Sequence, residues 1–141
     1  MLQEQYITFD TAKLLKRANF NVRCGGCYDE NGIPFNRFEN PDYVNAKTVS
    51  APSKALAMMW LREEYHIAVT PIPYRYPGKW KNILVYLGPP MEGDDKYDIC
   101  QLDKTYGSYE DAAEGGIQHV VKNIVMKVIR ERKKMAKEAK P

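Results

Sequence analysis

The sequence predicts an α+β fold: an antiparallel sheet of four or five strands with helices packed on one face, in the order α-β-β-α-β-β-(β)-α. Two features predict it. Apolar residues recur at helical spacing near residues 8–20, 53–66 and 108–130, and the intervening segments carry β-favouring residues with Asn-Gly and Pro-Gly turns. The length of 141 residues fits a single domain over residues 1–130 and a basic helical C-terminal extension over residues 131–141.

The first helix is expected to be short and to be followed by a hairpin. Thr8 can cap the helix, and Asn19 can end it in the left-handed conformation. Strands over 22–28 and 33–38 then flank Asn31-Gly32, a dipeptide that favours a tight turn.

The second helix should begin at Ser50 or Ser53 and end near His66. Pro71 and Pro73 lie in the β-rich stretch that follows. Because proline cannot donate to a strand ladder, we expect this strand at a sheet edge or irregular. Residues 80–87 form the best strand, with burial expected on both faces, and residues 99–102 can add a short one.

The last helix should be capped by Ser108 and should extend well past the body of the domain. Read to Lys137, it has about 30 residues and a length of about 45 Å. A compact body of this size is about 35–40 Å across, so the helix from Glu131 onward should overhang or fray. Gly115-Gly116 predicts close packing of this helix on the sheet. The expected core includes Leu15, Leu56, Trp60, Leu61, Val85, Ile117, Val121 and Ile124.

Composition excludes several classes of protein. Hydrophobic residues are 44% and charged residues 28%, which is typical of a soluble globular chain and not of a disordered one. No apolar run approaches the roughly 20 residues of a membrane span, and the first residues do not resemble a signal peptide. Three cysteines are too few for a disulfide scaffold, so we expect a cytoplasmic protein.

Cys24-Gly25-Gly26-Cys27 is the motif closest to a reactive or metal-binding site. It lies in a predicted strand and not at a helix N-terminus, and zinc would need two more ligands from the separated Cys100, His66 and His119. We therefore expect ordinary strand thiols, no metal and no cofactor. Cys100, His119 and Asp98 could form a Cys-His-Asp nucleophilic set, but nothing in their spacing favours it. No catalytic residue is predicted.

A predicted hairpin tip combines rings and cations. If Pro77-Gly78 is a two-residue turn, Tyr76 opposes Lys79 and Tyr74 opposes Lys81. Rings beside ammonium groups can hold single-stranded nucleic acid, and tyrosine is also common in protein interfaces. The alternative is a set of ordinary cross-strand pairs, in which lysines keep a sheet edge soluble.

The C-terminal end is strongly basic. Residues 122–141 contain eight Lys or Arg and two Glu, whereas the rest of the chain carries 13 basic and 16 acidic side chains. The candidate binding residues at this end are Arg132, Lys133, Lys134 and Lys137, here called the basic helix end. Such a cluster can bind nucleic acid or an acidic partner, or it can be a solvated helix end.

Several motifs occur together along the chain. They are Thr8-Phe9-x-x-Ala12-Lys13-Leu14-Leu15 with Phe20, Cys24, Tyr28-Asp29-Glu30-Asn31-Gly32, Ser50-Ala51-Pro52 leading into Leu56-Ala57-x-x-Trp60-Leu61-Arg62-Glu63, and Ser108-Tyr109-Glu110-Asp111-Ala112. In these motifs the chain resembles a loose group of short uncharacterised proteins encoded in phages, prophages and mobile elements of gut bacteria. The motifs are mainly caps, turns and core positions, so the resemblance implies a fold and carries no activity. Cys27 and the basic extension after Arg130 depart from the shared pattern.

These observations lead to one leading expectation and two alternatives. The leading one is a small non-enzymatic protein of a phage or mobile element that binds a host or phage protein, with no membrane contact. The first alternative is a nucleic-acid-binding accessory protein that uses the hairpin tip and the basic helix end. The second is a small enzyme without a recognisable catalytic set. The sequence leaves the oligomeric state open.

Overall fold

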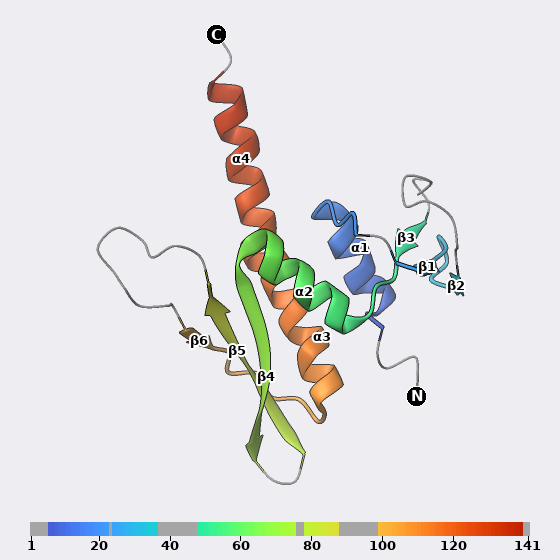
Figure 1. The fold of residues 1–141 in the computed structure, drawn as a ribbon, viewed down its shortest axis with the longest axis vertical. Coiled ribbons are helices and arrows are strands. Elements are labelled where there is room, and N and C mark those ends of the chain that lie inside the picture. Colours follow the sequence, from blue (N-terminus) through green and yellow to red (C-terminus); the bar gives the residue numbers. More distant parts are fainter. Residues whose placement is uncertain (1–5, 23, 37–47, 76–77, 88–98, 140–141) are drawn as a thin grey trace.

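The computed structural model describes residues 6–22, 24–36, 48–75, 78–87 and 99–139 and has mixed helix and sheet (Figure 1). In chain order, its elements are α1 (Phe9–Arg17), β1 (Gly26–Tyr28), β2 (Pro34–Asn36), β3 (Val49–Ser50), α2 (Lys54–Tyr65), β4 (Ile67–Arg75), β5 (Lys79–Tyr86), β6 (Ile99–Gln101), α3 (Tyr109–Val120), the π-helical turn η3 (Val121–Val125) and α4 (Met126–Glu138).

Each of the three predicted helix starts is capped by a hydroxyl side chain. Ser53 Oγ accepts a hydrogen bond from the backbone N–H of Leu56 at 3.1 Å, so Ser53, and not Ser50, caps α2. Ser108 Oγ likewise accepts from the N–H of Asp111 at 3.1 Å. Thr8 caps α1, and Asn19 follows that helix with φ 64°, as its sequence position predicts.

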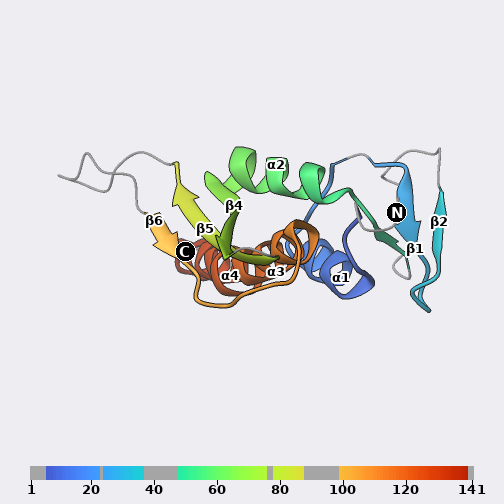
Figure 2. The ribbon, with the colours of Figure 1, turned by 90° about the horizontal axis from the view of Figure 1, so that it is seen from below.

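The strands of the described residues divide between two antiparallel sheets, ordered β2-β1-β3 and β4-β5-β6. The predicted single sheet of four or five strands is therefore not confirmed. The physical reason is that β3 pairs with β1, where Cys27 lies opposite Ser50, before the chain enters α2. Figures 1 and 2 both show the helices lying between the two sheets.

The first hairpin is confirmed, and its first strand, β1, is shorter than the expected 22–28. Tyr28 pairs with Pro34, and the Asp29 carboxylate accepts from the backbone N–H groups of Asn31 at 2.8 Å and Ile33 at 2.9 Å. Gly32 has φ 79°, a left-handed conformation that explains the glycine of the turn.

The second sheet turns one face to the core. β4 is an edge strand that pairs with β5, as its two prolines predict. Val69 and Leu84 pair with each other and are both buried, whereas Ile83 and Val85 on the other face of β5 are half-buried. The expectation that this strand is buried on both faces is thus wrong, because no described helix covers its outer face.

Most of the predicted core residues are buried. Leu15, Trp60, Leu61, Ile117 and Val121 belong to the main apolar cluster. Leu56, Val85 and Ile124 are half-buried, which corrects the prediction for these three. A polar contact also fixes α1 to α3: the Glu114 carboxylate accepts from the backbone N–H of Thr8 at 2.9 Å and from the hydroxyl of Thr11 at 2.5 Å.

The last helix is continuous from α3 through η3 to α4 and ends beyond the body of the molecule (Figure 1). The predicted overhang is confirmed, since α4 has no buried residue and residues 131–139 are all exposed. The π-helical turn was not predicted. Gly116 packs closely as expected: a Cβ built there would lie 2.5 Å from Val69 Cγ1.

Candidate functional site

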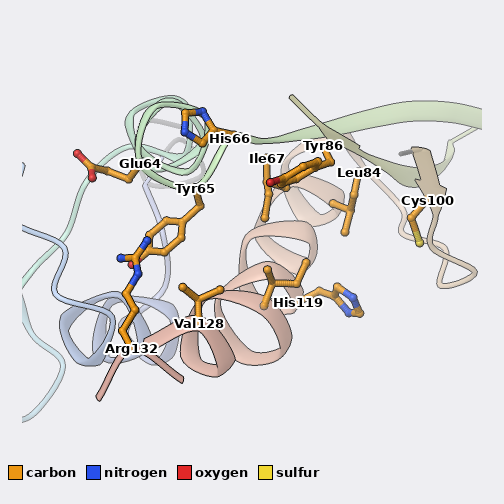
Figure 3. A pocket seen from close by; sticks show the side chains of 11 residues that line it. Glu64, Tyr65, His66, Ile67, Leu84, Tyr86, Cys100, His119, Val128 and Arg132 are labelled. Atoms are coloured by element: carbon orange, nitrogen blue, oxygen red, sulfur yellow. The ribbon is translucent and has the colours of Figure 1, made fainter. Parts of the chain in front are cut away.

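An open groove of about 530 Å³ lies where the last helix diverges from the sheet β4-β5-β6 (Figure 3). Three parts of the fold form its walls: the end of α2 with the start of β4, the strands β5 and β6, and one face of the last helix. The lining residues are Glu64, Tyr65, His66, Ile67, Leu84, Tyr86, Cys100, His119, Ile124, Val128 and Arg132, here called the groove.

The end of the groove at α2 is built by a sharp reversal of the chain. His66 has φ 57°, and its N–H donates to the carbonyl of Arg62 at 3.0 Å, which ends the helix. The carbonyl of His66 then accepts from the N–H of Leu87 at 2.6 Å, which ties this corner to the end of β5. The reversal therefore lets Tyr65 line one end of the groove and Ile67, two residues later, line its middle.

The middle of the groove is apolar. Ile67 and Leu84 are buried on the inner face of the sheet, and Ile124 and Val128 are half-buried on the helix opposite. Ile124 belongs to the π-helical turn, a rare element that often occurs at functional sites. This part of the groove can therefore accept apolar side chains of a ligand.

An aromatic and charged pair marks one end of the groove. The guanidinium carbon of Arg132 lies 5.8 Å from the centre of the Tyr65 ring, and Figure 3 shows the guanidinium group over that ring. Burial raises the pKa of the Tyr65 phenol, with a further rise from Glu64, and Arg132 works in the opposite direction. Arg132 is the one residue of the predicted basic helix end that lines the groove.

Cys100 and His119 also line the groove, at the end away from Arg132 (Figure 3). No hydrogen bond links the two side chains; the Nδ1 atom of His119 lies 3.3 Å from the amide nitrogen of Asn123. Asp98, the third member of the set drawn from the sequence, lies outside the described residues. Among the described residues, His119 makes no hydrogen bond to the Cys100 thiol and is not positioned as its base.

The predicted hairpin tip has a different register from the one expected. Lys79 pairs with Arg75 and not with Tyr76, and the register shifts between Pro73 and Arg75. The reason is that three residues separate the paired ends and Gly78 has φ 77°, so the turn is longer than the two-residue Pro77-Gly78 turn. Tyr76 itself lies outside the described residues.

Tyr74 and Lys81 nevertheless come together at this tip. The ammonium nitrogen of Lys81 lies 3.9 Å from the centre of the Tyr74 ring, and the guanidinium carbon of Arg75 lies 5.8 Å from it. Lys81 pairs with Ile72 in the ladder, so the contact with Tyr74 is diagonal. The Tyr74 ring is thus already covered in part by a cation of the same chain.

The basic helix end and the hairpin tip do not form one site. Lys133, Lys134 and Lys137 are exposed on the overhanging part of α4. The end of β4 and the start of β5 lie at the opposite end of the longest axis of the molecule (Figure 1). A single ligand would therefore have to span the whole molecule to contact both.

Cys24 and Cys27 are not joined in a disulfide. Cys27 is buried, and burial raises the pKa of Cys24, which makes its thiolate scarcer and its chemistry slower. Within the described ranges, no group of three or more His, Cys, Asp or Glu side chains has the arrangement to hold a metal ion.

Sequence reasoning identified Arg132 but not the groove around it. Tyr65 lies at the end of α2, Leu84 and Tyr86 lie on β5 and Val128 lies on α4, so these residues come from three separate elements. No local spacing links them, so only the tertiary arrangement reveals the groove.

None of the described helices has the length and apolar character that crossing a membrane requires. Comparison with protein-family models, with curated proteins and with solved structures finds no match to this chain.

Proposed function

We propose that the chain is a small non-enzymatic binding protein of a phage or mobile element, and that its groove binds a segment of a host or phage protein in the cytoplasm. The observation that carries the proposal is the groove itself, which is open, has an apolar middle and has two tyrosines and an arginine on its walls. Tyrosine and arginine are enriched at the energetic centres of protein interfaces.

The form of the groove favours a macromolecule over a small cofactor. Small-molecule sites usually enclose most of their ligand, whereas this groove is open and borders α4, which has no buried residue. A chain segment can lie along such a surface and leave its other side in solvent.

The test is capture from host lysate with matched variants of the full chain. Val128→Asp places a charge in the apolar middle of the groove, and Ile33→Asp places one at an exposed apolar side chain in the turn between β1 and β2. We expect a partner that binds the wild type and Ile33→Asp and is lost with Val128→Asp. Circular dichroism must show that both variants fold. A partner retained equally by all three proteins would contradict the proposal.

Nucleic-acid binding is the second candidate, and the overhanging α4 favours it. Residues 126–138 contain six Lys or Arg and two Glu, and none of them is buried. Retention on single-stranded and double-stranded DNA at increasing salt tests this candidate, because phosphate contacts make affinity fall steeply with salt. Binding through the overhang should be lost when residues 131–141 are deleted.

A further inference from the structure

We infer that the occupant of the groove is an acidic amphipathic helix of the partner protein, lying against the exposed face of α4. This inference rests on the proposed function and specifies the partner's chemistry. It follows from an apolar line that leaves the groove along the helix and from the charge that surrounds that line.

The apolar line consists of Ile124, Val128 and Met135, with Arg132 between the last two. Val128 follows Ile124 by four residues, Arg132 follows Val128 by four, and Met135 follows Arg132 by three. These helical spacings place all four residues on one side of the helix. Ile124 and Val128 are half-buried in the groove, whereas Met135 is 67% exposed. The line thus continues from the groove onto the overhang, where the described chain offers it no packing partner.

This arrangement suits a helix as the occupant. Apolar residues spaced by three and four are the seam along which one helix packs against another, and a single charged residue in such a seam is a common specificity feature. From Val128 to Glu138 the helix extends for about 15 Å, which is enough for three turns of a partner helix.

The charge of α4 indicates an acidic partner. Its six basic and two acidic residues give a net charge of +4. A second copy of the chain would bring two such helices together and would be disfavoured by repulsion, whereas carboxylates of a partner would be attracted. The acidic Glu64 lies at the α2 wall, so the partner's carboxylates should face α4 and Arg132.

A nucleic-acid duplex would use this charge but not the apolar line. Phosphates can reach the exposed lysines, yet a duplex backbone has no apolar side chains to fill the groove between Val128 and Leu84. The apolar groove beside the basic helix therefore favours a protein helix, and nucleic acid becomes an outcome of the test.

The test begins with a displayed library of random 16-residue peptides selected against the full chain. Enriched peptides should have apolar residues at helical spacing with Asp or Glu beside them, and should gain helicity on binding. One such peptide, synthesised with a fluorophore, then serves as the probe for measuring dissociation constants.

Charge reversal gives the sharpest measurement. Arg132→Glu should raise the dissociation constant of the probe roughly tenfold. A probe in which one acidic residue is replaced by Lys should regain affinity for that variant. Met135→Asp should also weaken probe binding, and because Met135 is exposed, this substitution should not impair folding. Lys79→Glu and Ile33→Asp are the matched controls and should leave affinity unchanged.

The outcomes separate this inference from the function it rests on. Probes that bind in the groove, are lost with Val128→Asp, but have no acidic helical pattern and ignore Arg132→Glu would overturn the inference and leave the proposed function standing. Probes indifferent to Val128→Asp, Arg132→Glu and Met135→Asp alike, or a chain that binds DNA and no peptide, would overturn both.

Discussion

The guanidinium carbon of Arg132 lies 5.8 Å from the centre of the Tyr65 ring, and this contact joins the overhanging helix to the end of α2. It is a cation–π contact at the rim of the groove, between residues 67 positions apart in the chain. It holds the base of the overhang beside the groove, so that the apolar middle and the basic end of the last helix meet at one place.

This contact can be measured through the phenol. Burial raises the pKa of Tyr65 and Arg132 lowers it, so we expect Arg132→Ala to raise that pKa further. An NMR titration of ring-labelled tyrosine would follow the Tyr65 signal. Lys133→Ala, at an exposed position one residue further along the helix, should leave the signal unchanged. A Tyr65 pKa that stays the same in Arg132→Ala would mean that the two side chains are apart in solution.

A second prediction concerns stability at alkaline pH. Burial raises the pKa of Tyr28, Tyr65 and Tyr106 and of the Cys24 thiol. The native state therefore holds these protons more tightly than the unfolded chain does. Below the ordinary pKa values of about 8.5 for a thiol and 10 for a phenol, their contribution to stability is fully present. As the pH rises through these values, the free energy of unfolding should fall.

Urea denaturation between pH 7 and pH 10.5 would show this decline. Tyr65→Phe removes one of the ionising groups and should make the decline shallower. A free energy of unfolding that rises over this range would contradict the assignment of burial as the main cause.

The core around Trp60 provides a third prediction. The Trp60 side chain is buried, and its ring meets Phe20 edge-on at 5.1 Å and Tyr65 at 5.4 Å between ring centres. Trp60→Ala should therefore lower the free energy of unfolding by about 3–5 kcal/mol. The neighbouring Met59, which is more exposed, is the control, and Met59→Ala should cost far less. A loss below about 1 kcal/mol for Trp60→Ala would be incompatible with this packing.

The fourth prediction tests how closely α3 packs on the sheet. A Cβ at Gly116 would lie 2.5 Å from Val69 Cγ1 and 3.0 Å from the Asn82 side chain, both of which are enclosed. Gly116→Ala gains about 1 kcal/mol of helix propensity, but overpacking costs about 1–3 kcal/mol, and we expect a net loss. Gly107→Ala, where the added Cβ has open space, is the comparison in the same denaturation assay.

Local patterns predicted most of the secondary structure, because caps and turns act over a few residues. The Ser53 and Ser108 caps, the Asp29–Gly32 turn and the left-handed Asn19 all follow from such short-range chemistry. The division into two sheets did not, since it depends on β3 pairing with β1, which is more than 20 residues away in the chain. Two residues of Val49–Ser50 carry too little pattern to predict a strand.

The groove could not be predicted from the sequence, because it too depends on contacts between distant segments. Its walls come from α2, β4, β5, β6 and the last helix, and the angle at which that helix leaves the sheet is a tertiary property. The register at the hairpin tip was missed because Pro77-Gly78 reads as a two-residue turn, whereas Arg75 pairs with Lys79. Arg132 was identified from charge alone, and charge could not show that its neighbour is Tyr65.

The last prediction separates the overhang's part in stability from its part in binding. Residues 131–139 are all exposed, so deleting residues 131–141 removes no core packing; the loss is the Arg132–Tyr65 contact. The free energy of unfolding should stay within about 0.5 kcal/mol, the range of ordinary surface changes. Affinity for the acidic helical probe should nevertheless fall sharply, because Arg132 and Met135 are gone. Denaturation and fluorescence titration on the same two proteins measure both effects. A deletion that unfolds the chain would mean that the end of α4 packs against the body, and unchanged affinity would mean that the partner does not reach the overhang.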